Sequence, residues 1–135
     1  MKNLKILHLI QDKNGDLVFL EALKDVDFEI KRVYWISNVT TETLRGFHAH
    51  RKLDQLLICI YGRIEIMYDN GFTRGSCLLD KSFKGFYVRR GIWHTMKWLQ
   101  ESSILLAITS DYYDESDYIR DYQEFLKLAR SGYWK

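Results

Sequence analysis

Three histidines and an arginine carry the chemistry that this sequence offers. His48 and His50 stand two residues apart in the segment RGFHAHRKLDQLLICIYG (45–62), and a third histidine, His94, follows later in GIWH. In a β-strand, residues i and i+2 point to the same face. We therefore expect His48 and His50 to project together into whatever that face encloses. Arg45, three residues before the pair, is placed to meet an anion or a developing enolate oxygen.

Two kinds of chemistry suit three imidazoles on one surface. Three histidines alone can bind zinc, and a carboxylate added to them would hold iron, manganese or nickel. Alternatively, histidine is the side chain most easily poised near neutral pH as a base or an acid. Two neighbouring imidazoles could then act as a base and its orienting partner, or remove a proton at one carbon and return it at the next. Simple packing of His48 and His50 in a core is less favoured, because burying two imidazoles beside an arginine is costly.

The spacing around the pair resembles the first motif of the cupin superfamily. That motif has a His-x-His pair, an acid a few residues later, and a glycine separated from the acid by six residues. Here His48, His50 and Gly62 match, but the position of the acid holds Gln55. Asp54 is the nearest carboxylate, and in a regular strand it would face the other way.

The segment Gly91-Ile92-Trp93-His94 resembles the core of the second cupin motif, although Arg89 and Trp98 replace its proline and closing asparagine. Glutamine is a poor substitute for an anionic metal ligand. These departures favour acid–base chemistry without a metal, and we expect no metal ligands and no cofactor.

Three tyrosines are candidate phenolic donors near the histidines. They are Tyr34, on a segment expected to line the barrel, together with Tyr112 and Tyr113. Each is more commonly a core or interface residue. The reaction class that fits a base, an arginine and phenolic donors is proton abstraction next to a carbonyl, followed by reprotonation.

Composition narrows the class of protein. The chain has 135 residues, 47% of them hydrophobic and 15% aromatic, which favours one ordered domain with a β bias. A net charge of +2 gives no argument for nucleic acid. The two cysteines, Cys59 and Cys77, each lie in an apolar segment and are expected to be free thiols. With no secretory signal and no membrane-length apolar segment, we expect a soluble cytoplasmic protein.

From residue 4 onward, the sequence consists of short apolar segments separated by turn residues. Turn signals recur at roughly 8–12 residues, which is typical of a sandwich or barrel. The Asn14-Gly15 step marks the first hairpin, and residues 40–47 form a polar loop before the histidine pair. The expected strands span residues 4–10, 16–21, 31–39, 55–60, 63–68, 76–79, 85–88, 94–99 and 103–109.

The pattern changes after Ser110, where helical spacing replaces the alternation. Ser116 can cap a helix from Asp117 onward, and Gly132 is a plausible stop. Apolar residues at 118, 119, 122, 125, 126 and 129 would bury one face of that helix. Many strands followed by one short helix predict a small antiparallel barrel or jelly roll.

The whole chain resembles a narrower family than the cupins. The segments RGFHAHRKLDQ, KRVYWI and SDYYDESDYIRDYQEF are similar to those of the thymidine-diphosphate-sugar 3,4-ketoisomerases, also called WxcM-like cupins. The resemblance implies a single all-β cupin jelly roll over residues 1–135 with a short C-terminal helix. It also implies a homodimer that exchanges N-terminal strands. The substrate would be dTDP-4-keto-6-deoxy-D-glucose, and the product its 3-keto isomer. An aminotransferase would convert that product to a 3-amino-3,6-dideoxy sugar for a surface glycan.

The resemblance also suggests roles for individual residues. His48 would be the base that removes the C3 proton, and His50 its partner or the group that completes proton transfer to C4. Arg45 would contact the diphosphate or the sugar oxygens. His94 would lie near the sugar and influence the face on which C4 is reprotonated, giving a galacto or a gluco product. Asn14, in the first turn, would lie close to the same region.

Three alternatives remain open at this level. A cupin 3,5-epimerase uses similar enolisation but typically pairs its base histidine with a carboxylate, whereas the histidine doublet favours isomerisation. A metal-dependent cupin enzyme would need the histidines as ligands. A non-catalytic cupin would bind the nucleotide sugar and leave it unchanged.

Overall fold

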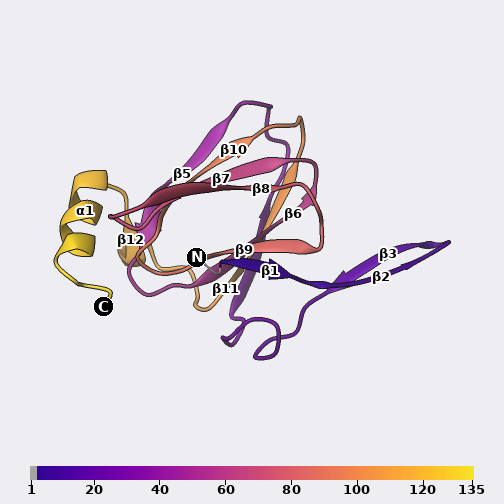
Figure 1. Ribbon diagram of the computed structural model, residues 1–135, viewed down its shortest axis with the longest axis horizontal. Coiled ribbons are helices and arrows are strands. Elements are labelled where there is room, and N and C mark those ends of the chain that lie inside the picture. The colour runs from indigo at the N-terminus through magenta and orange to yellow at the C-terminus, as the bar shows by residue number, and fades with distance from the viewer. Residues whose placement is uncertain (1–2) are drawn as a thin grey trace.

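Two five-stranded antiparallel sheets face each other in the computed structural model, which describes residues 3–135 (Figure 1). The first sheet has the order β1-β9-β6-β11-β4, and the second has the order β12-β5-β10-β7-β8. The strands of the first sheet are β1 (Leu4–Ile6), β9 (Lys84–Val88), β6 (Gln55–Tyr61), β11 (Ile104–Thr109) and β4 (Arg32–Ile36). Those of the second are β12 (Tyr118–Ile119), β5 (Leu44–His50), β10 (Trp93–Trp98), β7 (Ile64–Asp69) and β8 (Arg74–Leu79).

The inward faces of both sheets form the main core. Leu57 of β6 and Leu105 of β11 meet Ile66 of β7 and Trp98 of β10, and all four are fully buried. Burying one such side chain contributes about 1.5–3 kcal/mol relative to leaving it exposed. The predicted all-β jelly roll is confirmed.

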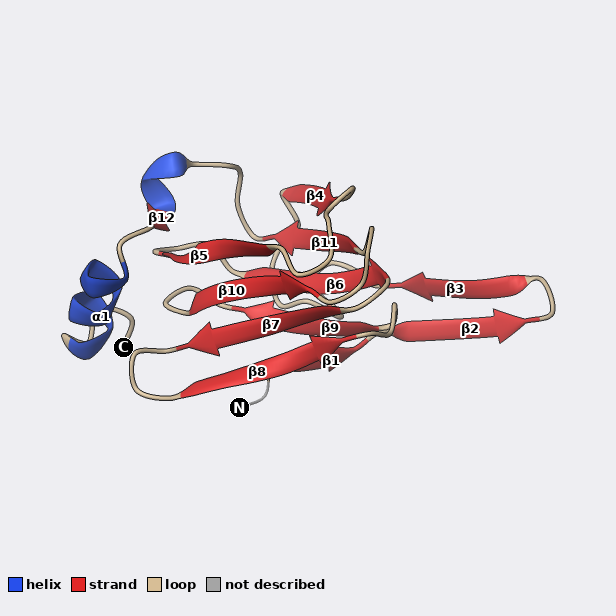
Figure 2. Ribbon diagram, turned by 90° about the horizontal axis from the view of Figure 1, so that it is seen from above, coloured by secondary structure: helices blue, strands red, loops and turns tan. Residues whose placement is uncertain are grey.

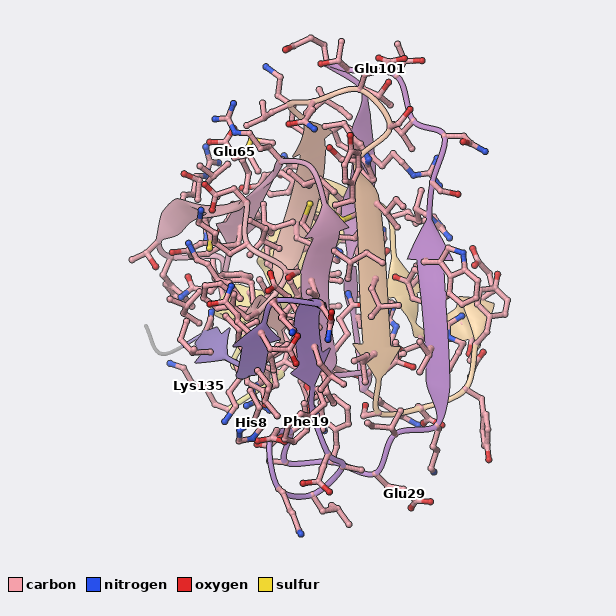
Figure 3. The ribbon with its side chains drawn as sticks, turned by 90° about the vertical axis from the view of Figure 1, so that its right-hand side faces the viewer. His8, Phe19, Glu29, Glu65, Glu101 and Lys135 are labelled. Atoms are coloured by element: carbon pink, nitrogen blue, oxygen red, sulfur yellow. The ribbon has the colours of Figure 1, made fainter. Side chains whose placement is uncertain are left out.

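A hairpin of β2 (His8–Asp12) and β3 (Gly15–Phe19) extends beyond the two sheets (Figure 2). The predicted Asn-Gly turn is confirmed at its tip. The expected continuous strand over residues 4–10 is wrong, because Leu7 interrupts it. Leu7 is buried and its N–H donates to the carbonyl of Phe83 at 2.7 Å. At the base of the hairpin, the rings of His8 and Phe19 stack with centroids 4.5 Å apart (Figure 3).

The C-terminal helix begins later than the sequence predicts. Helix α1 spans Tyr122–Arg130, and its N-cap is Asp121, whose side chain accepts the N–H of Gln123. Residues 115–117 form a short 3₁₀ turn (Glu115–Asp117) before strand β12. Tyr118 and Ile119 are therefore strand residues, because they pair with β5 of the barrel. Apolar spacing alone did not distinguish the two conformations.

A second difference lies before the histidine pair. Residues 40–47 do not all form a loop, since β5 already begins at Leu44 and pairs with β10. The two cysteines are free, as expected. Within residues 3–135, no helix is long and apolar enough to cross a membrane.

Candidate active site

The three histidines predicted to work together do lie together. His48 and His50 point inward from β5, and His94 stands directly opposite His48 on the neighbouring strand β10. Ring centroids are 5.0 Å apart for His48 and His50, 4.6 Å for His48 and His94, and 6.3 Å for His50 and His94. Two-residue spacing on one strand and cross-strand pairing with the next therefore produce the cluster.

A β-bulge in β5 orients His48. Thr95 pairs with Gly46 and His94 pairs with His48, so Phe47 is left over on the bulged strand. Gly46 has φ +101°, and a Cβ there would lie 2.9 Å from the carbonyl oxygen of His94. Phe47 has φ +59°, which is unusual for a bulky residue. Bulges of this kind re-aim side chains next to active sites.

The bulge also fixes the tautomer of His48. Nδ1 of His48 lies 3.0 Å from the carbonyl oxygen of Gly46. Because a carbonyl can only accept, Nδ1 carries the proton and Nε2 keeps its lone pair. Burial and the neighbouring His50 lower the pKa of His48 from 6.5 to about 4. His48 is therefore a neutral base near pH 7.

His50 has a different partner, which the sequence analysis missed. Its Nδ1 donates to Oδ2 of Asp117 at 3.1 Å, and both side chains are at most a tenth exposed. Burial lowers the pKa of His50, and the Asp117 charge opposes that effect. Strand β12 brings the pair together, because Tyr118 pairs with His50 in the ladder. The SDYIRDY block contained the signal, but assigning Asp117 to a helix start concealed it.

His94 is the most deeply buried of the three, with 1% of its surface exposed. Burial, with the charges that His48 and His50 would carry, holds its pKa well below the usual value. Its Nδ1 has only a long contact, 3.5 Å, to the carbonyl oxygen of Ile92. His94 is thus a neutral group placed beside the base.

A cavity of about 490 Å³ opens between β4, the edge strand of the first sheet, and β5 of the second sheet. Of the three histidines, only His48 lines it, whereas His50 and His94 are buried. Arg45 and Tyr34, both predicted from the sequence, lie on its wall. The lining residues are Arg32, Tyr34, Ile36, Leu44, Arg45, Gly46, Phe47, His48, Met96, Tyr113, Tyr118 and Arg120.

Strand β4 contributes a polar wall to this cavity. The Arg32 guanidinium stacks over the Tyr34 ring, 4.8 Å from its centroid. Burial raises the pKa of Tyr34 to about 12, so its hydroxyl keeps its proton and can donate. That hydroxyl lies 3.4 Å from Oε1 of Gln55, which is buried. Arg32 was not predicted as a site residue, although its position two residues before Tyr34 places both on one strand face.

The segment before α1 forms the remaining wall. Arg120 makes a two-pronged ion pair with Glu115, at 2.9 and 3.0 Å, and stacks over the Tyr118 ring at 4.4 Å. The Tyr113 hydroxyl donates to the same carboxylate at 2.8 Å. With Arg32 and Arg45, Arg120 gives the cavity three guanidinium groups, the side chains best suited to bind phosphate oxygens.

Two predicted residues do not reach the cavity within one chain. Tyr112 is 67% exposed and lies under the ammonium of Lys31. Asn14 lies at the tip of the β2–β3 hairpin, where its N–H donates to Asp12. A role for Asn14 at the active site would require the hairpin to reach another subunit, so its assignment stays a prediction.

Gln55 and Asp54, the two residues considered for the acid position of the first motif, lie in different surroundings. Gln55 occupies the barrel interior, whereas Asp54 pairs with Arg90 through bonds of 2.9 and 3.3 Å. Among residues 3–135, no three His, Cys, Asp or Glu side chains are grouped so that they could hold a metal ion.

Comparison with known proteins gives consistent similarities over nearly the whole chain. The FdtA family model, described as WxcM-like, C-terminal, matches residues 2–130. A TDP-4-oxo-6-deoxy-alpha-D-glucose-3,4-oxoisomerase from Aneurinibacillus thermoaerophilus is 42% identical over 118 residues, which cover 87% of this chain and 85% of the relative.

Solved structures agree with that similarity. A mutant of the 3,4-ketoisomerase QdtA from Thermoanaerobacterium thermosaccharolyticum, in complex with TDP-4-keto-6-deoxyglucose, has a TM-score of 0.94 at 34% identity, covering 100% of this chain and 99% of that one. The TDP-quinovose 3,4-ketoisomerase WlaRB from Campylobacter jejuni has a TM-score of 0.88 at 40% identity, covering 94% and 99%. A dTDP-4-dehydrorhamnose 3,5-epimerase from Bacillus anthracis is only 16% identical and shares the fold alone.

Proposed function

The chain belongs to the WxcM-like FdtA family, and we propose that it is a sugar 3,4-ketoisomerase that converts dTDP-4-keto-6-deoxy-D-glucose into a dTDP-3-keto-6-deoxyhexose. The observation that carries this proposal is His48. It is a neutral imidazole with a free Nε2, on the wall of a cavity that also holds three arginines. A base beside anion-binding groups suits a nucleotide sugar whose reacting carbon lies next to a ketone.

The proposed reaction moves a carbonyl by one carbon without a redox cofactor. The C4 ketone acidifies the C3 hydrogen, and Nε2 of His48 removes it. The resulting enediolate carries charge on its oxygens, which Arg45 and the Tyr34 hydroxyl stabilise. The O3 proton moves to O4, and the proton taken by His48 passes to His50, which completes its transfer to C4 and leaves both histidines neutral. His94, beside His48, would influence the face that receives this proton.

The test is direct incubation with dTDP-4-keto-6-deoxy-D-glucose. Carbon NMR should show the ketone signal move from C4 to C3, and an added 3-aminotransferase should trap the product as an amino sugar of definable C4 configuration. A product that keeps its C4 ketone and inverts other centres would identify a 3,5-epimerase. Unchanged substrate would indicate a binding protein, and loss of activity after EDTA treatment would show that a metal is required.

We also propose that the protein is a homodimer with exchanged N-terminal hairpins. A lone two-stranded hairpin is marginally stable in water, yet β2–β3 projects from the barrel with Ile10 and Leu17 each more than half exposed (Figure 2). On the outer face of the first sheet, Val33 and Trp35 of β4 are 48% and 65% exposed. Two such apolar surfaces per chain can cover each other around a two-fold axis.

Trp35→Arg should therefore convert a dimer of the 16.2-kDa chain into a monomer. Its side chain is exposed in a single chain, so the charge disturbs only an interface. Light scattering after size-exclusion chromatography measures the mass. Phe72→Arg is the matched control, because Phe72 is equally exposed but lies in the β7–β8 turn. A Trp35→Arg protein that stays dimeric at micromolar concentration would contradict the proposed interface.

A further inference from the structure

The carboxylate of Asp117 accepts three hydrogen bonds within the active site. Its Oδ1 accepts the backbone N–H of Lys52 at 2.7 Å, and its Oδ2 accepts the N–H of Leu53 at 3.3 Å and Nδ1–H of His50 at 3.1 Å. Its side chain is only 10% exposed. Three donors therefore converge on one carboxylate, and they fix it at the back of the histidine cluster.

This arrangement sets the proton on His50. A carboxylate accepts and does not donate, so Nδ1 of His50 carries a proton and Nε2 holds a lone pair. When His50 gains a second proton, the Asp117 charge stabilises the imidazolium at short range. The orientation is held from both sides, because Tyr118, next to Asp117, pairs with His50 in the β12–β5 ladder.

His48 has no comparable support. Its Nδ1 is held by the neutral carbonyl of Gly46, and among residues 3–135 no carboxylate lies within hydrogen-bond distance to stabilise the positive charge it would gain as an imidazolium. The two imidazoles therefore have the same tautomer, but a second proton is better stabilised on His50 than on His48. His48 is suited to taking a proton briefly at the cavity wall, and His50 is suited to storing one.

We propose that Asp117 is a positioning residue that makes His50 the group returning the proton to C4. This inference rests on the proposed ketoisomerase function and divides its two proton steps between two histidines. His48 accepts the C3 proton as the enediolate forms and passes it to the neighbouring His50, whose ring centroid is 5.0 Å away. His50 holds it as an imidazolium beside Asp117 until it is returned to C4, so both histidines end the cycle neutral, as they began it. The groups that face His50 and contribute to its charge balance are Asp117, His48, His94, Tyr118, Arg32 and Arg120.

The experiment separates the two steps by NMR in D₂O. Exchange of the C3 hydrogen of the substrate for deuterium reports the first step, and appearance of the 3-keto product reports both. For Asp117→Asn we expect C3 exchange within about threefold of wild type and product formation reduced about 10²-fold or more, with KM nearly unchanged. The acid limb of the rate profile should also move, because His50 loses its negative partner.

Asp114→Asn is the matched control, because Asp114 lies in the same segment, caps the 3₁₀ turn through Ser116, and makes no hydrogen bond to a histidine within the part of the chain that the structure describes. It should leave both rates unchanged. His50→Gln tests the same claim without removing the bonds that Asp117 makes to Lys52 and Leu53, and it should give the same split. Adding Asp117→Asn to that variant should then cost little more.

Equal losses of C3 exchange and product in Asp117→Asn and in His50→Gln would overturn the inference, since they would indicate general disorder of the site. Unchanged product formation in either variant would also overturn it. Failure of the proposed function looks different: the wild-type protein itself would then form no 3-keto product.

Discussion

Replacing His48 with asparagine should lower turnover by about 10³-fold or more while TDP binding stays within a few-fold of wild type. General acid–base catalysis typically contributes 10²–10⁴-fold, and His48 is the histidine that lines the cavity. An asparagine amide can still donate to the Gly46 carbonyl, so the bulge keeps a partner, but the amide has no basic lone pair. Turnover is measured by product NMR and TDP binding by calorimetry.

His8→Asn is the control for this experiment. His8 is the one histidine outside the cluster, where it pairs with Asp25 at 2.6 Å. Its replacement should leave turnover within a few-fold of wild type. A His48→Asn protein that keeps the wild-type rate would show that His48 is not the base. A parallel loss of TDP affinity would show instead that His48 holds the nucleotide.

The sequence predicted those parts of the site that depend on spacing along one strand. His48 and His50 share a face because they are two residues apart, and Tyr34 lies on a strand that lines the cavity. His94 was identified by its glycine-containing motif, and the β5–β10 register explains why it meets His48. Local periodicity carries this information without knowledge of the full topology.

Asp117 could not be found in the same way. It lies 67 residues from His50, and only the pairing of a two-residue strand brings them together. The apolar spacing of residues 118–129 favoured a helix. Residues 118 and 119 nevertheless form a strand, because their pairing with β5 overrides that local preference. A 3,5-epimerase typically pairs its base histidine with a carboxylate, and the His50–Asp117 contact is a pair of this kind. The NMR test of the product, which distinguishes an epimerase from a ketoisomerase, is therefore more important.

More of the fold than of the site could be predicted, because turns and strands have local signals in the sequence. Gly62, the glycine that ends the first motif, is one such signal. It has φ +96°, a conformation that costs other residues roughly 1–2 kcal/mol. The structure adds a reason that the sequence could not give: Ser103, just before β11, lies where a side chain at position 62 would project.

Gly62→Ala should therefore destabilise the protein by about 3 kcal/mol or more. A Cβ at position 62 would lie 2.6 Å from Cβ and 2.9 Å from Cα of Ser103. Ser103 cannot move aside easily, because its hydroxyl accepts the N–H of Arg63 at 2.9 Å and donates to the carbonyl of Gln100 at 2.8 Å. Overpacking adds about 1–3 kcal/mol to the backbone strain.

Thermal unfolding followed by circular dichroism should show a Tm lowered by about 10 °C for Gly62→Ala. Gly15→Ala is the matched control, since Gly15 also has a positive φ, +137°, but no atom lies within 4 Å of its Cβ position. The Gly15→Ala variant would have backbone strain but no steric clash, so its free energy of unfolding should fall by only about 1 kcal/mol. Equal losses of stability in the two variants would mean that backbone strain alone accounts for the requirement for glycine at position 62. A larger loss in Gly62→Ala would show that the close contact with Ser103, and not backbone strain alone, requires glycine at position 62.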